Sequence, residues 1–275
     1  MGVSLLLESW VDMPLNDQMQ HPSFPQPSDE NVLVWRYLTF DKFKWLVEES
    51  RLYMPCLFDF QDQLEGRSPN GQKDWWTTTA NSETNPDRKK IILDNFKKIE
   101  SFAESFRKKY FVSCWHLNDF ESPKMWGEYA NTYASVAIKT TYKRLANALP
   151  NYLNIGMVRY INYKNDRLPE TFNLFDYVMH KDNDQFGLES EVRVIAVPPV
   201  PAFAEDHKHF FSNLFEKASG QKNYLFAPPV ELNDLFDDVI IRPRASAEEQ
   251  QLIADFCRKH KAPPPRVSEC EACDL

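Results

Sequence analysis

The stretch Gly187-Leu188-Glu189-Ser190-Glu191-Val192-Arg193-Val194-Ile195 decides the expected fold, because it places three charges at alternate positions of an otherwise apolar strand. In an extended strand, successive side chains point to opposite faces. Glu189, Glu191 and Arg193 would therefore share one face, with the two valines on the other. Such a strand has an apolar side for a core and a charged side that is either solvated or functional.

Two further strands of the predicted sheet each carry one polar side chain of interest. Val32-Leu33-Val34-Trp35-Arg36-Tyr37-Leu38 contains Arg36, and Phe111-Val112-Ser113-Cys114-Trp115 contains Ser113. A guanidinium in an apolar strand needs a carboxylate, a carbonyl or an anionic ligand. Arg36 is therefore expected to be either a structural ion-pair partner or an anion ligand.

The serine strand continues into a histidine. Ser113 and Trp115 would share one face of this strand, and His116 would lie on the other. A serine and a histidine suggest nucleophilic catalysis, but Ser113 is not in a G-x-S-x-G elbow and no orienting acid is evident. Ser113 is instead expected to hydrogen-bond a ligand or a carboxylate.

Helical periodicity between these strands indicates an α/β (α+β) fold with helices around a sheet. Apolar residues at helical spacing follow Thr39, and a long amphipathic helix starts near Asp87, with its apolar stripe expected in the core. Ser122-Pro123 and the capping box Ser246-Ala247-Glu248-Glu249 indicate two more helix starts. Residues 66–87 are polar and are expected to form turns.

The composition indicates a globular chain in a reducing compartment. It has 275 residues, 43% of them apolar, a formal net charge of −8 and five cysteines. An odd cysteine count without a basic and apolar leader disfavours a disulfide framework. No run approaches the roughly 18 apolar residues of a membrane span. We therefore expect a cytoplasmic protein with no membrane partner, and the acidic balance disfavours a nonspecific nucleic-acid surface.

The chain is expected to have three parts. Residues 1–31 would form an extended arm, 32–261 a single catalytic-like domain, and 262–275 a flexible tail. The Pro-rich segment 198–231 is long enough to be a functional cover or a recognition loop. In the tail, Cys270-Glu271-Ala272-Cys273 has the spacing of a metal site but no second pair of ligands, so no metal is expected there.

Two other groups of charged residues are candidates for ligand binding. Asp59, Asp62 and Glu65 resemble a metal-binding cluster, but their loop lacks the alternation of an EF-hand. Arg242-Pro243-Arg244 could bind an anion, although pairing with acidic neighbours at the end of a strand is the simpler expectation. We therefore predict no metal ligands.

Three aromatic residues could wall a site that stacks a planar ring. They are Trp115, Trp126 and Tyr129, of which the last two lie on the short helix after Ser122-Pro123. Ordinary core packing would explain each of them as well.

Several motifs together resemble those of a large bacterial family of domains of unknown function. The resemblance covers residues 32 to about 258. It is carried by Trp35-Arg36-Tyr37, Phe111-Val112-Ser113-Cys114-Trp115-His116, Met125-Trp126-Gly127-Glu128-Tyr129, His180-Lys181, Glu189-Ser190-Glu191-Val192-Arg193 and Arg242-Pro243-Arg244. By itself this resemblance names no reaction.

The order of Arg36, Ser113 and Glu189-Ser190-Glu191 is also similar to that of ADP-ribosyltransferases of the arginine-serine-glutamate class. Those enzymes carry an arginine on the first core strand, a serine motif on a strand followed by a helix and another strand, and a Glu-x-Glu or Gln-x-Glu turn before a later strand. This resemblance implies a mixed split β-sheet core with surrounding helices and NAD as co-substrate. Where the family usually has a second Ser or Thr, this chain has Trp115.

The resemblance also implies roles for individual residues. Glu191 would hold the ribose 2′-hydroxyl and stabilise an oxocarbenium-like transition state, and Glu189 would orient or deprotonate the acceptor. Ser113 would position Glu191 or the ribose, and Arg36 would clamp the diphosphate. The residues expected to contact NAD are Arg36, Tyr37, Ser113, Trp115, His116, Trp126, Tyr129 and Arg193.

The leading functional hypothesis is thus an NAD-dependent mono-ADP-ribosyltransferase in a bacterial cell, acting as a toxin or defence effector. Its acceptor could be a protein, a nucleic acid or a small molecule, and its oligomeric state is not predicted. One alternative is a non-catalytic nucleotide-binding or sensing module on the same fold. Another is a metal-dependent nuclease or hydrolase that uses Asp62, Glu65 and Glu191 around a divalent ion.

Overall fold

The computed structural model describes residues 21–62, 64–169, 173–197 and 225–270. At its centre is a mixed sheet in the order β11-β10-β4-β1-β3-β8-β5, in which β10 and β11 are parallel and the other neighbours antiparallel. Its strands are β1 (Leu33–Leu38), β3 (Phe111–Leu117), β4 (Val136–Thr141), β5 (Asn154–Met157), β8 (Glu191–Ala196), β10 (Asp238–Ile241) and β11 (Arg266–Val267). The expected α/β class is confirmed.

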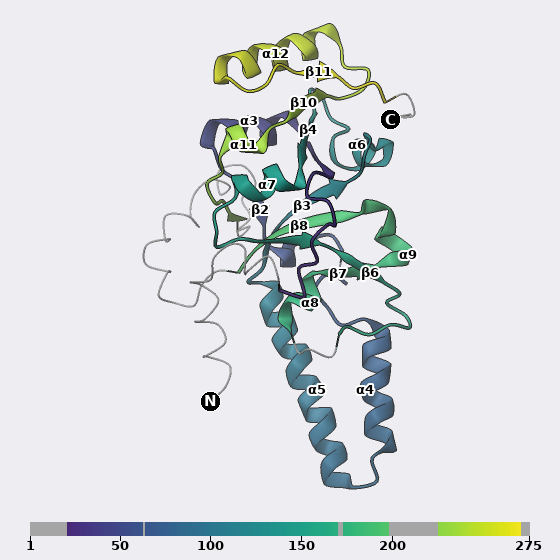
Figure 1. The fold of residues 1–275 in the computed structure, drawn as a ribbon. Coiled ribbons are helices and arrows are strands. Elements are labelled where there is room, and N and C mark those ends of the chain that lie inside the picture. Colours follow the sequence, from purple (N-terminus) through teal and green to yellow (C-terminus); the bar gives the residue numbers. More distant parts are fainter. Residues whose placement is uncertain (1–20, 63, 170–172, 198–224, 271–275) are drawn as a thin grey trace.

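Shorter strands and helices surround this sheet (Figure 1). The antiparallel strands β2 (Met54–Pro55) and β9 (Leu225–Phe226) form one pair, and the parallel strands β6 (Arg159–Ile161) and β7 (His180–Asp182) another. The helices are α3 (Phe40–Glu49), α4 (Asn70–Ser82), α5 (Pro86–Arg107), α6 (Pro123–Tyr129), α7 (Tyr142–Ala148), α8 (Leu174–Val178), α9 (Asn183–Phe186), α11 (Leu232–Leu235) and α12 (Ala247–His260), with 3₁₀ turns η1 (Leu57–Asp59) and η2 (Gly187–Glu189).

The two faces of the large sheet have different coverings. Alternation along the strands places Val34, Trp115 and Val194 on one face, which packs against α3, α7, α11 and α12; we call it the α3 face. The opposite face carries Tyr37 and His116 and meets α6 and the β6–β7 pair; we call it the α6 face.

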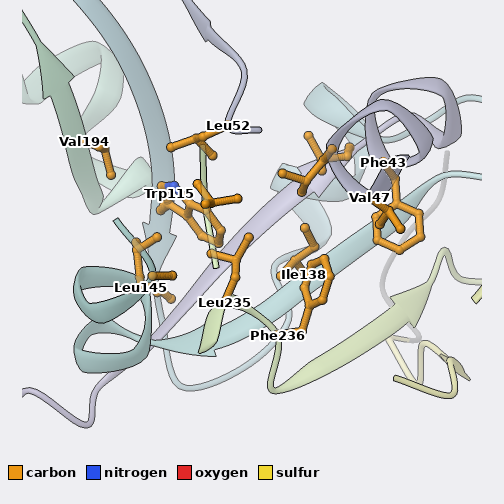
Figure 2. Packing of buried hydrophobic residues seen from close by; sticks show 14 of the residues in the cluster. Phe43, Val47, Leu52, Trp115, Ile138, Leu145, Val194, Leu235 and Phe236 are labelled. Carbon is orange, nitrogen blue, oxygen red and sulfur yellow. The ribbon is translucent and has the colours of Figure 1, made fainter. Parts of the chain in front are cut away.

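The main hydrophobic core lies on the α3 face. Trp115 and Ile138 from the sheet gather there with Phe43 of α3, Leu145 of α7 and Phe236, which follows α11 (Figure 2). All five are buried. Because burying an apolar side chain of this size stabilises a fold by about 1.5–3 kcal/mol, this cluster explains why the strands alternate as they do.

The sheet consists of two halves joined by a short ladder. The strand pairs β1–β4 and β3–β8 each extend over six residue pairs, whereas β1 and β3 are paired only at Val34 with Leu117 and Trp35 with His116. Beyond this joint, the guanidinium of Arg36 donates a hydrogen bond to Oγ of Ser113. The narrow joint agrees with the expected split β-sheet, and His116 lies directly on it.

One expectation about residues 66–87 is wrong, because α4 occupies most of this segment. It forms an antiparallel hairpin with α5, and the two helices extend away from the sheet (Figure 1). Only Gly71 and Ala80 of α4 are buried. A helix that buries so few residues needs no apolar stripe, and without a stripe the sequence does not predict it. A Cβ on Gly71 would lie 2.4 Å from the carbonyl oxygen of Asp166, so only glycine allows this close approach.

The start of α5 agrees with the sequence, but its apolar stripe was wrongly assigned to the core. Asn85 caps the helix, and Pro86 takes the first helical position. Of the apolar stripe, only Ala103 is buried, whereas Ile91 and Phe102 are 58% and 48% exposed. The physical reason is that α5 projects beyond the sheet and packs mainly on α4.

Other local signals are confirmed. Thr39 and Ser122 each accept a hydrogen bond from a backbone N–H at the start of a helix. Ser246 and Glu249 form the full capping box of α12. These polar residues satisfy N–H groups that have no partner within the helix.

One boundary differs from the expected one. Residues 266–267 of the expected flexible tail form β11, paired with β10. Residues 1–20 of the arm, 198–224 of the Pro-rich segment and the last five residues lie outside the described residues. Within the part that is described, no helix is both long and apolar enough to cross a membrane.

Candidate functional site

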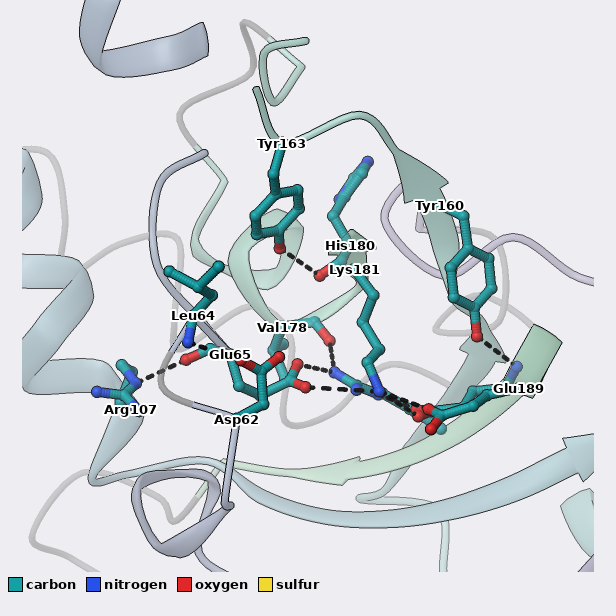
Figure 3. Close-up of polar contacts among 12 residues, drawn as sticks. Asp62, Leu64, Glu65, Arg107, Tyr160, Tyr163, Val178, His180, Lys181 and Glu189 are labelled. Carbon is teal, nitrogen blue, oxygen red and sulfur yellow. Dashed lines mark hydrogen bonds and ion pairs between the residues drawn. The ribbon is translucent and has the colours of Figure 1, made fainter. Parts of the chain in front are cut away.

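A buried cluster of five charged side chains lies on the α6 face (Figure 3). Nζ of Lys181 lies 2.6 Å from Oε2 of Glu189 and 2.8 Å from Oε1 of Glu191. Arg193 joins Glu191 to Glu65, with nitrogen-to-oxygen distances of 2.7 Å on both sides. We call Glu65, Lys181, Glu189, Glu191 and Arg193 the carboxylate cluster.

The local backbone brings the two glutamates together by a different route from the one predicted. Glu189 is not on the strand but in η2, and Ser190 has a left-handed φ of 42° before β8 begins at Glu191. The expected alternation therefore holds for Glu191 and Arg193 only. Lys181, on β7, bridges Glu189 to the strand and restores the pair.

Hydrogen bonds between side chains and backbone groups fix the residues of the cluster in place. Arg193 donates to the carbonyl oxygen of Val178, and Arg107 donates from Nε to the carbonyl oxygen of Glu65 at 2.7 Å. The backbone N–H of Glu191 donates to the hydroxyl oxygen of Tyr160 at 2.9 Å. Because these contacts come from α5, β6 and the end of α8, the carboxylates are held from several elements at once.

The cluster separates the ionisation behaviour of the two glutamates. Burial alone would raise the pKa of Glu191, but Arg193 and Lys181 outweigh burial and hold this pKa well below its usual range. Burial and the adjacent Glu191 raise the pKa of Glu189, against the opposing effect of Lys181. Two carboxyl groups with diverging pKa values can take different roles in acid–base chemistry.

Three aromatic side chains lie on the same face as Glu189, and one of them contacts its carboxylate. The hydroxyl of Tyr129, which is 50% exposed, donates to Oε1 of Glu189 at 3.5 Å. Tyr37 packs edge-on against Trp126, with ring centroids 4.9 Å apart. The structure thus brings Tyr37, Trp126 and Tyr129 to the same face as the two glutamates, and the half-exposed ring of Tyr129 is the one available for stacking.

His116 is also on the α6 face, where it pairs in register with Glu191. Its Nδ1 contacts the carbonyl oxygen of Glu189, and since a carbonyl only accepts, Nδ1 carries the proton. Burial lowers the pKa of His116, so the ring is neutral at pH 7 and Nε2 is an acceptor. Within the described part of the chain, this buried Nε2 has no hydrogen-bond partner.

Arg36, Ser113 and Trp115 are on the opposite, α3 face. Ser113 pairs in register with Val194 and Trp115 with Val192, and Oγ of Ser113 accepts from both Arg36 and Nε1 of Trp115. Trp115 is part of the main core (Figure 2). The structure therefore joins these three residues to one another but separates them, by the thickness of the sheet, from Glu191.

The environment of Arg36 explains how a guanidinium is kept in an apolar strand. Besides Ser113, it donates to the carbonyl oxygen of Tyr53 at 2.8 Å and lies 5.5 Å from the ring centre of Trp115. Burial lowers its pKa to about 10. Of the partners expected for this guanidinium, the structure therefore shows a carbonyl, together with a hydroxyl and an aromatic face.

The other charged candidates have structural partners. Glu65 is bound by Arg193, Oδ1 of Asp62 accepts from the backbone N–H of Leu64, and Nε of Arg242 lies 2.6 Å from Oε1 of Glu249. Among the residues that the structure describes, no three His, Cys, Asp or Glu side chains are arranged so that they could hold a metal ion. These contacts favour ion pairing for Glu65 and Glu191 over the metal-dependent alternative.

Sequence reasoning missed Lys181 as a site residue, and it assigned Glu65 only to a possible metal cluster. Lys181 entered only as half of the His180-Lys181 motif of the resemblance, and a lone lysine in a short strand has no residue pattern that assigns it to a site. Its burial, at 6% exposed, was the informative property, because lysine is almost never buried unless it is paired.

Comparisons with known proteins give one distant structural similarity. No protein-family model matches the chain, so the resemblance to a family of unknown function has no support there, and no curated protein matches either. The chain is similar to the solved structure of Thermus sp. 2.9 DarT in complex with carba-NAD+, at 8% sequence identity and a TM-score of 0.32. The match covers 87% of this chain and 95% of that chain. Since the similarity is this weak, the function proposed below rests on the geometry of the site.

Proposed function

We propose that the chain is an NAD-dependent ADP-ribosyltransferase whose reaction takes place on the α6 face, at Glu189 and Glu191. The observation that carries this proposal is the charge of the carboxylate cluster. Its two cations, Lys181 and Arg193, face three carboxylates, which leaves one formal negative charge in a buried site. That charge lies next to half-exposed Tyr129, where a ligand can approach.

A fixed, uncompensated negative charge suits this reaction for an electrostatic reason. NAD carries a positive pyridinium ring, and cleavage of its bond to ribose passes through an oxocarbenium-like transition state. A preorganised carboxylate contributes most when positive charge develops beside it in a site of low dielectric constant. The cluster as a whole would supply this charge, with Glu191 kept ionised by Arg193 and Lys181.

The remaining polar and aromatic groups fit the rest of the ligand. Nε2 of His116 needs a donor, and the ribose hydroxyls and the carboxamide of nicotinamide are donors. Tyr129 offers a half-exposed ring for stacking. The proposed site therefore consists of Tyr37, His116, Trp126, Tyr129, Glu189 and Glu191, whereas Arg36, Ser113 and Trp115 brace the sheet from its other face.

The proposed transfer breaks one bond of NAD and forms one bond to the acceptor. The bond between C1′ of the ribose and the ring nitrogen of nicotinamide breaks, and its electron pair leaves with neutral nicotinamide. An oxygen or nitrogen of the acceptor forms the new bond to C1′. Its proton passes to Glu189, whose raised pKa makes it the better base of the pair. No oxidant or reductant is needed.

The test uses NAD labelled in the adenylate phosphate, with purified protein and a cell lysate. We expect label transfer to macromolecules and release of nicotinamide, and we expect Glu189→Gln and Glu191→Gln to lower the rate by about 10²- to 10³-fold. Glu104→Gln is the matched control, because Glu104 is an ion-paired glutamate outside the cluster. Wild-type protein that neither transfers label nor releases nicotinamide would refute the proposal.

A second candidate is a non-catalytic module that binds a nucleotide at the same face. It is favoured by the fact that both carboxylate oxygens of Glu191 are already engaged, one by Lys181 and one by Arg193. Thermal-shift titration separates the two candidates. Stabilisation by NAD or ADP-ribose with no turnover supports the module, since a ligand that binds only the folded state raises the melting temperature.

A further inference from the structure

We propose that Lys181 is a positioning residue that holds Glu189 and Glu191 in the arrangement the transfer requires. This inference rests on the proposed function, which it deepens by naming a group that acts through the two glutamates. Lys181 itself would not touch the substrate.

The geometry of Lys181 is that of a bridge. Its side chain is 7% exposed and lies over Phe186, with Nζ 4.0 Å from the ring centre. The ammonium contacts Glu189 and Glu191 directly and lies 3.8 Å from Oε2 of Glu65. One cation thus meets all three carboxylates of the cluster.

Lysine suits this position better than arginine does. Its ammonium is a compact charge with three rotatable donors, so it can bridge carboxylates that come from different elements. The planar fork of arginine favours two bonds to a single carboxylate instead. Because Glu189 lies in η2 and Glu191 starts β8, their separation depends on a group that is fixed to neither element.

Removal of Lys181 should change ionisation as well as stability. The cluster would then have one cation for three carboxylates, and like charges held close together raise the pKa of one of them. Arg193 would still hold Glu191. The proton should therefore go to Glu189, which would lose its function as a base at neutral pH.

The direct test does not depend on turnover. Protein labelled with ¹³C at the glutamate carboxyl carbons is titrated by NMR, and the signals are assigned with Glu189→Gln and Glu191→Gln. We expect the titration midpoint of Glu189 to rise in Lys181→Met, with little change in Lys139→Met. Lys139 is a matched control because it is an ion-paired lysine on β4, outside the cluster. An unchanged midpoint for Glu189 in Lys181→Met overturns the inference, whatever the activity of the wild type.

Kinetics provide the second measurement. We expect Lys181→Met to lower kcat by about 10²-fold with a small effect on KM, as for loss of a transition-state contact. The acid limb of its pH profile should move to higher pH, and Lys181→Arg should recover part of the rate. A purely structural lysine would leave the position of that limb unchanged, and this result would also overturn the inference.

If Lys181→Met fails to fold, a double substitution provides the test instead. Lys181→Met with Glu189→Gln removes one charge of each sign and avoids an unpaired buried carboxylate at Glu189. The midpoint of Glu191 in this protein is compared with that in Glu189→Gln alone. A higher midpoint supports the role of Lys181, and an equal one contradicts it. A wild type without activity towards NAD refutes the proposed function but leaves these titrations decisive for Lys181.

Discussion

Glu191 and Ser113 lie on neighbouring antiparallel strands, yet their side chains project from opposite faces of the sheet. The register pairs Ser113 with Val194 and Glu191 with His116. The polar partner of the glutamate across the ladder is therefore the histidine. The proposed chemistry is therefore assigned to the α6 face, and this assignment determines which substitutions should affect activity.

Ser113→Ala should lower stability, whereas His116→Ala should weaken the binding of NAD. Ser113→Ala leaves donors of Arg36 and Trp115 without an acceptor, so we expect a loss of stability of about 1–3 kcal/mol in urea denaturation and an unchanged kcat. His116→Ala should raise KM for NAD roughly tenfold, the equivalent of about 1.4 kcal/mol. A large loss of kcat in a folded Ser113→Ala protein would place the serine in the site and contradict the division between the faces.

Tyr129→Ala should weaken NAD binding with little effect on stability. The side chain is 50% exposed, so its removal opens no core cavity. Loss of a stacking ring costs about 1–3 kcal/mol of binding, and Tyr129→Phe should retain it. Tyr152→Ala is the control, since Tyr152 is similarly exposed but lies in the turn between α7 and β5. Calorimetric titration with NAD measures all three, and equal affinity of Tyr129→Ala and wild type would remove Tyr129 from the site.

Arg193→Met should be among the most destabilising substitutions. Arg193 is fully buried, and its loss leaves three carboxylates of the cluster with Lys181 as their one cation. Breaking a buried ion pair on one side costs about 3–5 kcal/mol. Arg258→Met removes an exposed pair with Asp255 and should cost about 0–1 kcal/mol. Urea denaturation curves give both values, and a similar loss in the two proteins would mean that the cluster is solvated.

Acid should weaken the packing of α12 through Glu249. The hydrogen bond from Arg242, together with backbone N–H groups of Ala134 and Ser246, lowers the pKa of Glu249 to about 2. Since its pKa is lower in the folded state, the stabilisation is complete above the ordinary glutamate value and is lost as the pH falls from there towards 2. In Glu249→Gln, this part of the pH dependence should be missing from the unfolding free energy. An identical pH dependence in the variant would show that Glu249 contributes none of it.

Much of the fold could be predicted because its signals are local. The caps at Thr39, Ser122 and Ser246 and the alternation within β1, β3 and β8 each depend on a few adjacent residues. The hairpin of α4 and α5 could not be predicted in the same way. Its helices protrude from the body, so the rule that an apolar stripe faces a core fails for residues such as Ile91.

The six residues of the proposed site could be named from the sequence, but Lys181 and the separation of Arg36, Ser113 and Trp115 from that site could not. Tyr37, His116, Trp126, Tyr129 and both glutamates lie together, whereas Ser113 does not join them. Chain order cannot show which face a side chain occupies relative to another strand, because one residue of register reverses the answer. The pairing through Lys181 depends on contact between β7 and the turn before β8, and only the folded chain shows it.

The short ladder between β1 and β3 has a consequence for any ligand of this face. Tyr37 belongs to one half of the sheet and Glu191 to the other, and the backbone joins the halves through only two residue pairs. A molecule that touches both side chains spans this seam. Binding of such a molecule would therefore stabilise the part of the sheet that has the fewest hydrogen bonds between strands. Amide hydrogen exchange should slow first at this seam.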